Sequence, residues 1–147
     1  MKVMAVDHGS ARTGLAVSDP SAALAGDAWV LSGESVRQLR TEAQAIMAEA
    51  VSRDVDVIVV GYPKNMDGSA GPSAEKSKEL AGLIREQCES GARSIEVVLW
   101  DERLTTVSAH KILSDTGVYG KKRKKTVDAV AASLILEGYL QYIHLNQ

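Results

Sequence analysis

Acidic side chains follow apolar runs at widely separated points of this chain. Asp7 comes directly after one such run, and Asp101 and Glu102 come directly after another. Asp128 stands near the start of a third apolar segment. Carboxylate oxygens are the ligands that Mg²⁺ and Mn²⁺ prefer, whereas the scattered histidines and the single cysteine offer no cluster for zinc. If the fold brings the acids together, they predict a divalent-cation site.

A run of cations precedes the last of these acids. Lys121 to Lys125 (KKRKK) ends three residues before Asp128. Cations attract a phosphate backbone while carboxylates hold the metals that activate water, so the combination predicts phosphodiester cleavage. Each feature also has a simpler explanation, since a charge run is often a solvated loop and an acid at a helix start offsets the helix dipole. The convergence of the sites favours the nuclease interpretation.

Further polar groups near the acids could contact phosphate. In the DERLTT stretch, Arg103 and Thr105 could address phosphate oxygens, with carboxylates at a helix N-terminus and a surface arginine as the alternative. Lys64 and Asn65 belong to a glycine-rich loop that could position the substrate. The alternative for this loop is an ordinary N-M-D-G turn with Gly68 at positive φ.

Apolar periodicity indicates which elements position these residues. The pattern predicts strands at 2–6, 15–18, 29–31, 55–60 and 95–100, and helices at 34–52, 73–88, 107–113 and 126–142. A hairpin followed by right-handed crossover units builds an α/β fold with a mixed five-stranded sheet and helices on both faces. Functional groups are then expected beyond the carboxyl ends of the parallel strands, where Asp7 and Glu102 fall.

Length and composition set limits on the function. With 147 residues, of which 45% are hydrophobic, the chain predicts a single domain over residues 1–147. One cysteine permits no internal disulfide, and no leader or membrane-spanning run is present, which predicts a cytoplasmic protein without membrane contacts. The absence of Phe argues against a base-stacking platform, and the net charge of −2 restricts nucleic-acid binding to a local patch.

Spaced motifs covering most of the chain resemble the YqgF/RuvX family. They are DHGSARTGLAVSD from position 7, VGYPKNMDG from 60, WDERLTT from 100, KRKK from 122 and DAVAASLIL from 128. The resemblance implies a ribonuclease-H-like fold and a metal-dependent nuclease that matures the 5′ end of pre-16S rRNA in ribosome biogenesis, in a family grouped with Holliday junction resolvases. It also implies that Asp7, Glu102 and Asp128 are the catalytic acids and the ligands of Mg²⁺ or Mn²⁺.

One feature departs from the junction resolvases of this fold. Their second acid ends the strand beside the first, but here that strand ends at Gly61. The second acid must come from the last strand, about two strand spacings or roughly 10 Å away. Strand alternation does not decide between Asp101 and Glu102, and Glu102 is preferred for its reach and its match to the family. The substrate contacts predicted here are Arg103, Thr105, Lys64, Asn65, Lys122, Arg123, Lys124 and Lys125.

Other functions remain open. The hairpin beginning at Asp7 is similar to the phosphate loop of actin-like and sugar-kinase ATPases, but those chains carry a second lobe that is absent here. A Holliday junction resolvase acting on branched DNA would favour a symmetric homodimer with two sites. A non-catalytic RNA-binding factor would use the cationic run alone and would be insensitive to Asp7→Asn.

Overall fold

The computed structural model describes residues 1–91, 94–104 and 120–146 of the chain. Its elements, in chain order, are β1 (Val3–His8), β2 (Arg12–Ser18), β3 (Ala25–Ser32), the 3₁₀ turn η1 (Gly33–Val36), α1 (Leu39–Ser52), β4 (Val57–Tyr62), α2 (Pro72–Ser90), β5 (Glu96–Asp101), the 3₁₀ turn η2 (Glu102–Leu104) and α4 (Gly120–Leu145). The helix predicted at 107–113 lies outside the described residues.

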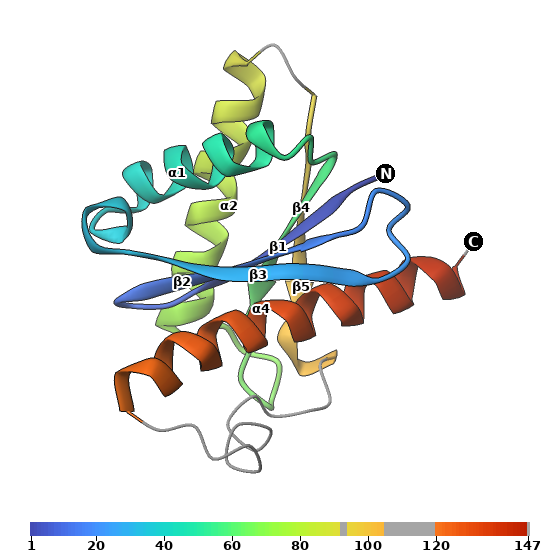
Figure 1. Ribbon diagram of the computed structural model, residues 1–147. Helices are drawn as coiled ribbons and strands as arrows, with labels where there is room; N and C mark the ends of the chain where they lie inside the picture. The colour runs from blue at the N-terminus through green and yellow to red at the C-terminus, as the bar shows by residue number, and fades with distance from the viewer. Residues whose placement is uncertain (92–93, 105–119, 147) are drawn as a thin grey trace.

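The strands form one mixed sheet in the order β3-β2-β1-β4-β5. The β1–β2 and β2–β3 pairs are antiparallel, whereas β4 runs parallel to both of its neighbours, β1 and β5. The predicted α/β fold with a mixed five-stranded sheet is therefore confirmed, and the carboxyl ends of β1, β4 and β5 meet at one edge of the sheet (Figure 1).

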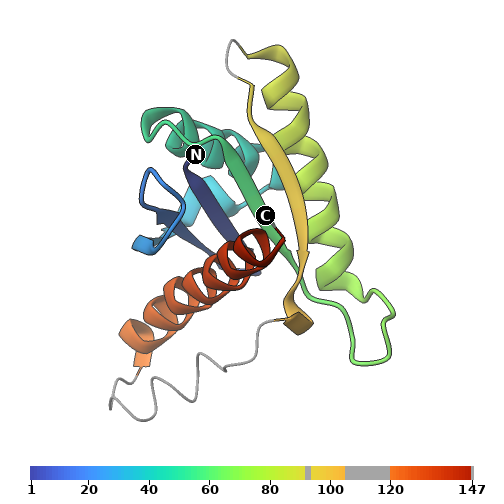
Figure 2. The same cartoon turned by 90° about the vertical axis from the view of Figure 1, so that its right-hand side faces the viewer.

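Helices cover both faces of the sheet (Figure 2). On one face, α1 and α2 bury a core that includes Met4 and Val6 of β1. On the other face, α4 buries a second core that includes Val3 and Ala5, the alternate residues of the same strand. Successive side chains of a strand point to opposite faces, so this alternation determines which layer each residue of β1 contacts.

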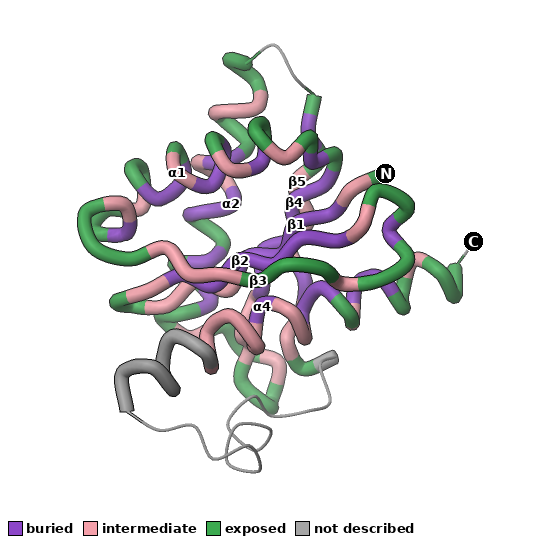
Figure 3. The backbone as a smooth tube through the Cα atoms, viewed as in Figure 1, coloured by how far each residue is buried: buried purple, intermediate pink, exposed green. Residues whose placement is uncertain are grey.

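The inner face of α4 shows the spacing of an amphipathic helix. Ala132, Ile135, Leu136 and Tyr139 are spaced three and four residues apart and are all buried against the sheet. Buried segments recur along α4 (Figure 3). Asp128 lies one turn before Ala132, so the same helical face carries it towards the sheet. Among the described residues, no helix is long and apolar enough to cross a membrane.

Several boundaries differ from the sequence prediction. Strand β1 extends to His8, and β2 already begins at Arg12. Asp7 therefore lies inside its strand, and the turn between the two strands is short. The helix predicted at 34–52 is divided into η1 and α1, because Gln38 between them has an extended backbone, with φ −129° and ψ 146°. The strand predicted at 29–31 runs from Ala25 to Ser32.

The most consequential difference is at the start of the last helix. It begins at Gly120 rather than at 126, so the run from Lys121 to Lys125 is helical and is not a loop. Lysine and arginine are good helix formers, and no residue between Gly120 and Asp128 breaks a helix. Asp128 consequently begins the third turn, and the idea that it offsets the dipole at a helix start is wrong.

Candidate active site

Asp7 is the centre of the candidate site. It follows Val3 and Ala5 in the alternation of β1, which places its side chain on the face of the sheet that α4 covers. Its neighbours on the adjacent strands are both glycines. Gly14 pairs with Asp7 directly, and Gly61 follows Val60, which pairs with Val6.

The two glycines clear the space in which other acids reach Asp7. A Cβ atom on Gly14 would overlap the backbone carbonyl oxygen of Asp128, so the missing side chain lets α4 approach the sheet. A Cβ on Gly61 would lie 3.1 Å from Cδ of Glu102 and 2.7 Å from Cδ1 of Ile135. Glu102 therefore extends over β4 from η2 towards β1, which is how it spans the intervening strand.

The carboxyl groups of Asp7 and Glu102 form a hydrogen-bonded pair, in which Asp7 donates. Burial, together with the negative charges of Glu102 and Asp128, raises the pKa of Asp7 to about 8. Burial also raises the pKa of Glu102. Like charges packed this closely out of water cannot all ionise unless a proton or another cation compensates them.

Asp101, the alternative to Glu102, points elsewhere. Its carboxylate accepts hydrogen bonds from the backbone N–H of Arg103 at 3.0 Å and from Nη2 of the same arginine at 2.7 Å. These bonds lower the pKa of Asp101. The ion pair between Asp101 and Arg103 fixes the conformation of η2. Glu102, which stands between these two residues in the sequence, is thereby left on the side of Asp7.

The third acid, Asp128, has a cationic partner that the sequence prediction missed. Nε of Arg12 donates a hydrogen bond to Oδ2 of Asp128 at 2.9 Å, and both side chains are about three-quarters buried. Arg12 begins β2 and shares the α4 face with Gly14. Arg12 and Gly14 are two residues apart, and side chains alternate between the faces of a strand. This alternation was the signal that could have placed Arg12 near Asp128.

A second buried polar group lies on the opposite face of the sheet. Nδ1 of His8 and the hydroxyl of Thr13 both contact Oε2 of Glu42, at 2.7 and 2.9 Å, and the Glu42 side chain is fully buried. A carboxylate can only accept, so Nδ1 carries the hydrogen of this bond. Glu42 was also missed, although an acid one turn before Ile46, on the apolar face of α1, was a detectable signal.

The predicted substrate contacts do not all approach the acids. Arg103 is engaged with Asp101, and Asn65 donates to the Ser69 hydroxyl at 3.0 Å within its own loop. Lys64 lies over the Tyr62 ring at 5.6 Å. Gly68 has a φ of +90°, as the alternative interpretation of this loop, an N-M-D-G turn, requires. Thr105 lies outside the described residues. The first turns of α4 contain the predicted contacts Lys122, Arg123, Lys124 and Lys125, of which only the backbone is described.

The site offers oxygen donors but is not arranged as a finished metal centre. Among the described residues, no three His, Cys, Asp or Glu side chains already surround one point. Asp7 and Glu102 share a proton while Asp128 is bound to Arg12. Buried carboxyl groups that must share a proton are nevertheless the kind of donor set that a hard divalent cation stabilises, and the residues therefore fit Mg²⁺ or Mn²⁺.

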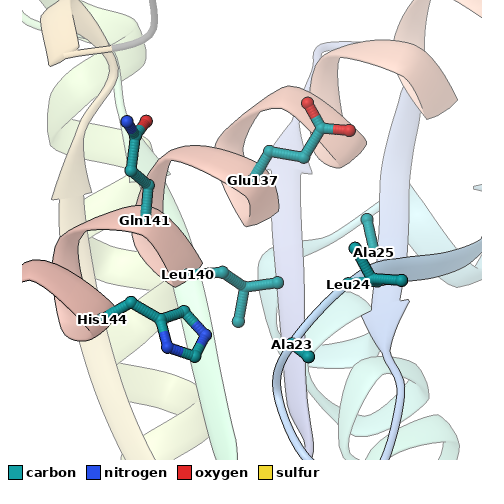
Figure 4. Close-up of a pocket in the computed structure, with 7 residues that line it drawn as sticks. All are labelled: Ala23, Leu24, Ala25, Glu137, Leu140, Gln141 and His144. Atoms are coloured by element: carbon teal, nitrogen blue, oxygen red, sulfur yellow. The ribbon is translucent and has the colours of Figure 1, made fainter.

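A cavity beside α4 is separate from these acids. It has a volume of about 370 Å³ and lies between the β2–β3 connection and the carboxyl-terminal half of α4 (Figure 4). Leu24, Leu140 and His144 are among its lining residues, and Nε2 of His144 contacts the carbonyl oxygen of Ala22 at 2.8 Å. Asp7, Glu102 and Asp128 do not line it, so it is no part of the candidate site.

Comparisons with known proteins identify relatives of similar length. A protein from Halothermothrix orenii named "Putative pre-16S rRNA nuclease" is 38% identical over 143 residues, which is 97% of this chain and 96% of that protein. A protein of the same name from Shouchella clausii is 39% identical over 145 residues, covering 95% and 94%. The fold is similar to that of Thermus thermophilus RuvC bound to a Holliday junction, with a TM-score of 0.53, 17% identity and coverage of 97% and 96%.

The family model described as "RuvX: Holliday junction resolvase" matches residues 1–142. This match extends over all the described elements except the end of α4, and it includes Asp7, Glu102 and Asp128. The likeness to RuvC identifies the fold as ribonuclease-H-like. The chain therefore belongs to the RuvX family.

Proposed function

We propose that this protein is a metal-dependent nuclease that cleaves the leader of pre-16S rRNA during maturation of its 5′ end. The observation that carries the proposal is the buried, hydrogen-bonded pair of Asp7 and Glu102 with Asp128 close enough to raise the pKa of Asp7. Relatives of matching length bear the name of a pre-16S rRNA nuclease, which supports the substrate.

In this proposal, Asp7, Glu102 and Asp128 hold one or two Mg²⁺ or Mn²⁺ ions. Such an ion supplies Lewis acidity that lowers the pKa of water and stabilises the departing oxyanion. Asp7 and Glu102 would hold the ion through their carboxylate oxygens, whose negative charges the ion would compensate in place of a proton. Arg12 orients Asp128, and Asp101 fixes Arg103 so that Glu102 stays turned inward.

The cationic first turns of α4 would guide the substrate. Lys122 to Lys125 belong to the same helix as Asp128, within about two turns of it, and cations at this distance along the chain would attract a phosphate backbone towards the acids. Two further cations could contact the substrate. Arg103 follows Glu102 directly in the sequence, and Lys64 lies on the loop after β4. The protein would act in the cytoplasm, where pre-rRNA is processed.

A second candidate function is resolution of Holliday junctions. The description of the matching family and the fold shared with a junction-bound RuvC favour it. This activity needs two sites on two strands and therefore a symmetric dimer.

Cleavage of two end-labelled substrates tests the proposal. Wild type, Asp7→Asn and the control Asp27→Asn, an exposed acid of β3, are incubated with the pre-16S leader RNA and with a four-way DNA junction. We expect wild type and Asp27→Asn to form cleavage products when Mg²⁺ or Mn²⁺ is present. Asp7→Asn should form no more product than the wild type forms with chelator. The better substrate separates RNA maturation from junction resolution.

Equal cleavage by wild type and Asp7→Asn would exclude the carboxylate mechanism. Binding of the RNA without any cleavage, unchanged in Asp7→Asn, would favour a non-catalytic RNA-binding factor instead.

A further inference from the structure

Arg12 is a cation bonded directly to the candidate catalytic acids. Its Nε donates to Oδ2 of Asp128 at 2.9 Å, and 28% of its side chain remains exposed. Asp128 in turn lies close enough to Asp7 for its charge to act on that carboxyl group. Because the partner of Arg12 is one of the three acids, a phosphate that is held at these acids also comes close to the guanidinium.

The strands place Arg12 at the open end of the site. Asp7 pairs with Gly14, and Arg12 lies two residues before Gly14 on the same face of the sheet. Since β2 runs antiparallel to β1, these two residues lead outward beyond Asp7, towards the end of β1, by about 7 Å. Pairing with Ser32 of β3 fixes the backbone of Arg12 there. The guanidinium therefore reaches Asp128 from the outer edge of the sheet.

The bond to Asp128 leaves most donors of Arg12 available. A guanidinium carries five N–H groups in a planar fork, and among the described residues only the one on Nε has an acceptor. The two Nη nitrogens carry the other four, in the geometry that pairs with two oxygens of one phosphate. Arg12 also occupies a single oxygen of Asp128, so Oδ1 stays available to the cation of the proposed function.

Arg103, the arginine that the sequence favoured for phosphate contact, is bonded differently. Its Nε and Nη2 both donate to Oδ2 of Asp101, at 3.0 and 2.7 Å, and Asp101 is not one of the three acids. Among the described residues, Arg12 is the arginine whose ion-pair partner is a candidate catalytic acid. The ion pairs thus distinguish two arginines that the sequence alone does not.

We propose that Arg12 binds the phosphate that is cleaved through its Nη groups, while its Nε holds Asp128. The inference rests on the proposed function and deepens it, because it assigns the side chain that offsets the charge of the reacting phosphate. Asp128 and the sheet orient the guanidinium before the substrate binds. Little reorganisation is then needed as charge builds up on the phosphate oxygens.

The first test detects the contact and does not need cleavage. In Asp7→Asn with chelator, the Nε–H signals of the arginines are followed by NMR while a short single-stranded RNA of the leader sequence is added. Arg12→Lys identifies the Arg12 signal by its loss. We expect this signal to shift on RNA binding. An Arg12 signal that stays fixed while other signals of the protein shift would overturn the proposal.

Arg53 is the matched control for Arg12. Its Nε donates to Glu49 at 3.1 Å, and 34% of its side chain is exposed, so the two arginines have similar ion pairs and similar burial. Arg53 follows α1 and precedes β4, and therefore lies at the opposite edge of the sheet from the acids. Its Nε–H signal should not shift with RNA.

The second test measures RNA binding in the same Asp7→Asn background with chelator, with folding checked by circular dichroism. Arg12→Gln should weaken binding about tenfold, as expected for a hydrogen bond between charged groups, and reduce the salt slope by about 0.7. Arg12→Lys keeps the charge and should keep the slope. Arg53→Gln should change neither quantity.

A double-mutant cycle separates contact with phosphate from mere neutralisation of Asp128. Arg12→Gln is repeated on Asp128→Asn, where there is no carboxylate left to neutralise. A direct contact with phosphate retains the loss of RNA binding in this second background. A loss that disappears there would show that Arg12 acts only through Asp128, and would overturn the proposal.

The outcomes also separate this proposal from the proposed function. Equal RNA binding by Arg12→Gln and Arg53→Gln would overturn the phosphate contact, even if the wild type cleaves the leader. A shifted Arg12 signal and a retained binding loss would establish the contact, even if the wild type cleaves neither substrate and the proposed function fails.

Discussion

The proton shared by Asp7 and Glu102 makes the stability of the protein depend on pH. Burial and neighbouring acids raise the pKa of Asp7 from 3.8 to about 8. The unfolded chain ionises this residue above about pH 4, whereas the folded protein keeps it protonated until about pH 8. The stability associated with Asp7 is therefore fully present below pH 4 and is lost as the pH rises to 8, at up to about 1.4 kcal/mol per pH unit.

Denaturant unfolding in chelator between pH 4 and 9 measures this slope. We expect the free energy of unfolding to fall less steeply in Asp7→Asn, because the amide does not titrate. A wild-type slope no steeper than that of Asp7→Asn would show that the pKa of Asp7 is not raised in the folded protein.

Glu42 supports a different prediction at the scale of one residue. Its fully buried carboxylate holds His8 and Thr13, so Glu42→Ala leaves two buried polar groups without their partner. Loss of one partner of a buried pair costs about 3 kcal/mol or more in unfolding free energy. Glu49→Ala on the same helix removes a half-exposed partner of Arg53 and should cost less than about 1 kcal/mol. Chemical denaturation of both variants measures the difference, and similar losses would contradict the assigned role of Glu42.

The individual acids were predictable from the sequence, but their partners were not. Asp7 and Glu102 were predicted because each comes after an apolar run, and only the ion pair with Arg103 separates Asp101 from Glu102. The hydrogen bond that joins Arg12 to Asp128 spans 116 residues of chain, so no local pattern contains it. Residue types therefore support a hypothesis about the chemistry, while the fold determines which charges meet.

At the scale of elements, two glycines allow α4 and η2 to approach β1. Adding a methyl group to Gly14 forces it against the backbone of Asp128, which cannot move as a flexible side chain would. We expect Gly14→Ala to destabilise the protein by about 1–3 kcal/mol and to reduce cleavage by displacing Asp128. Thermal unfolding and the cleavage assay measure the two effects.

Gly82 provides the control for this prediction. It lies within α2, and a Cβ there meets no atom within 4 Å, so Gly82→Ala should raise stability by about 0.5–1 kcal/mol and leave cleavage unchanged. If Gly14→Ala is as stable and as active as Gly82→Ala, the close approach of α4 at Gly14 is not what positions Asp128.

The elements themselves were largely evident from periodicity, because buried strands and one-sided helices carry strong apolar patterns. The start of α4 was not, since its first turns are cationic and have no apolar stripe, so the pattern detects the helix only where it meets the sheet. The merging of η1 and α1 into one predicted helix has a different cause. Their break at Gln38 is a backbone conformation without a glycine or proline to mark it.

At the scale of the whole molecule, one chain supplies all the acids of one site. Asp7, Glu102 and Asp128 come from β1, η2 and α4 of the same chain, and none requires a second copy. An RNA leader presents one scissile bond to one such site, whereas a junction must be cut on two strands by two sites. The two candidate functions therefore differ in how activity depends on the number of active chains.

Mixing wild type with Asp7→Asn at constant total concentration distinguishes them. If independent single sites cleave the leader RNA, the rate falls in direct proportion to the wild-type fraction, so that a half-and-half mixture retains about half of it. Paired cutting of a junction by a freely exchanging dimer falls as the square of that fraction, because both subunits must be active, and the same mixture retains about a quarter. We expect the linear dependence on the RNA leader. A quadratic dependence there would mean that each cut requires two intact copies, and that the single-chain site formed by β1, η2 and α4 is insufficient for the reaction.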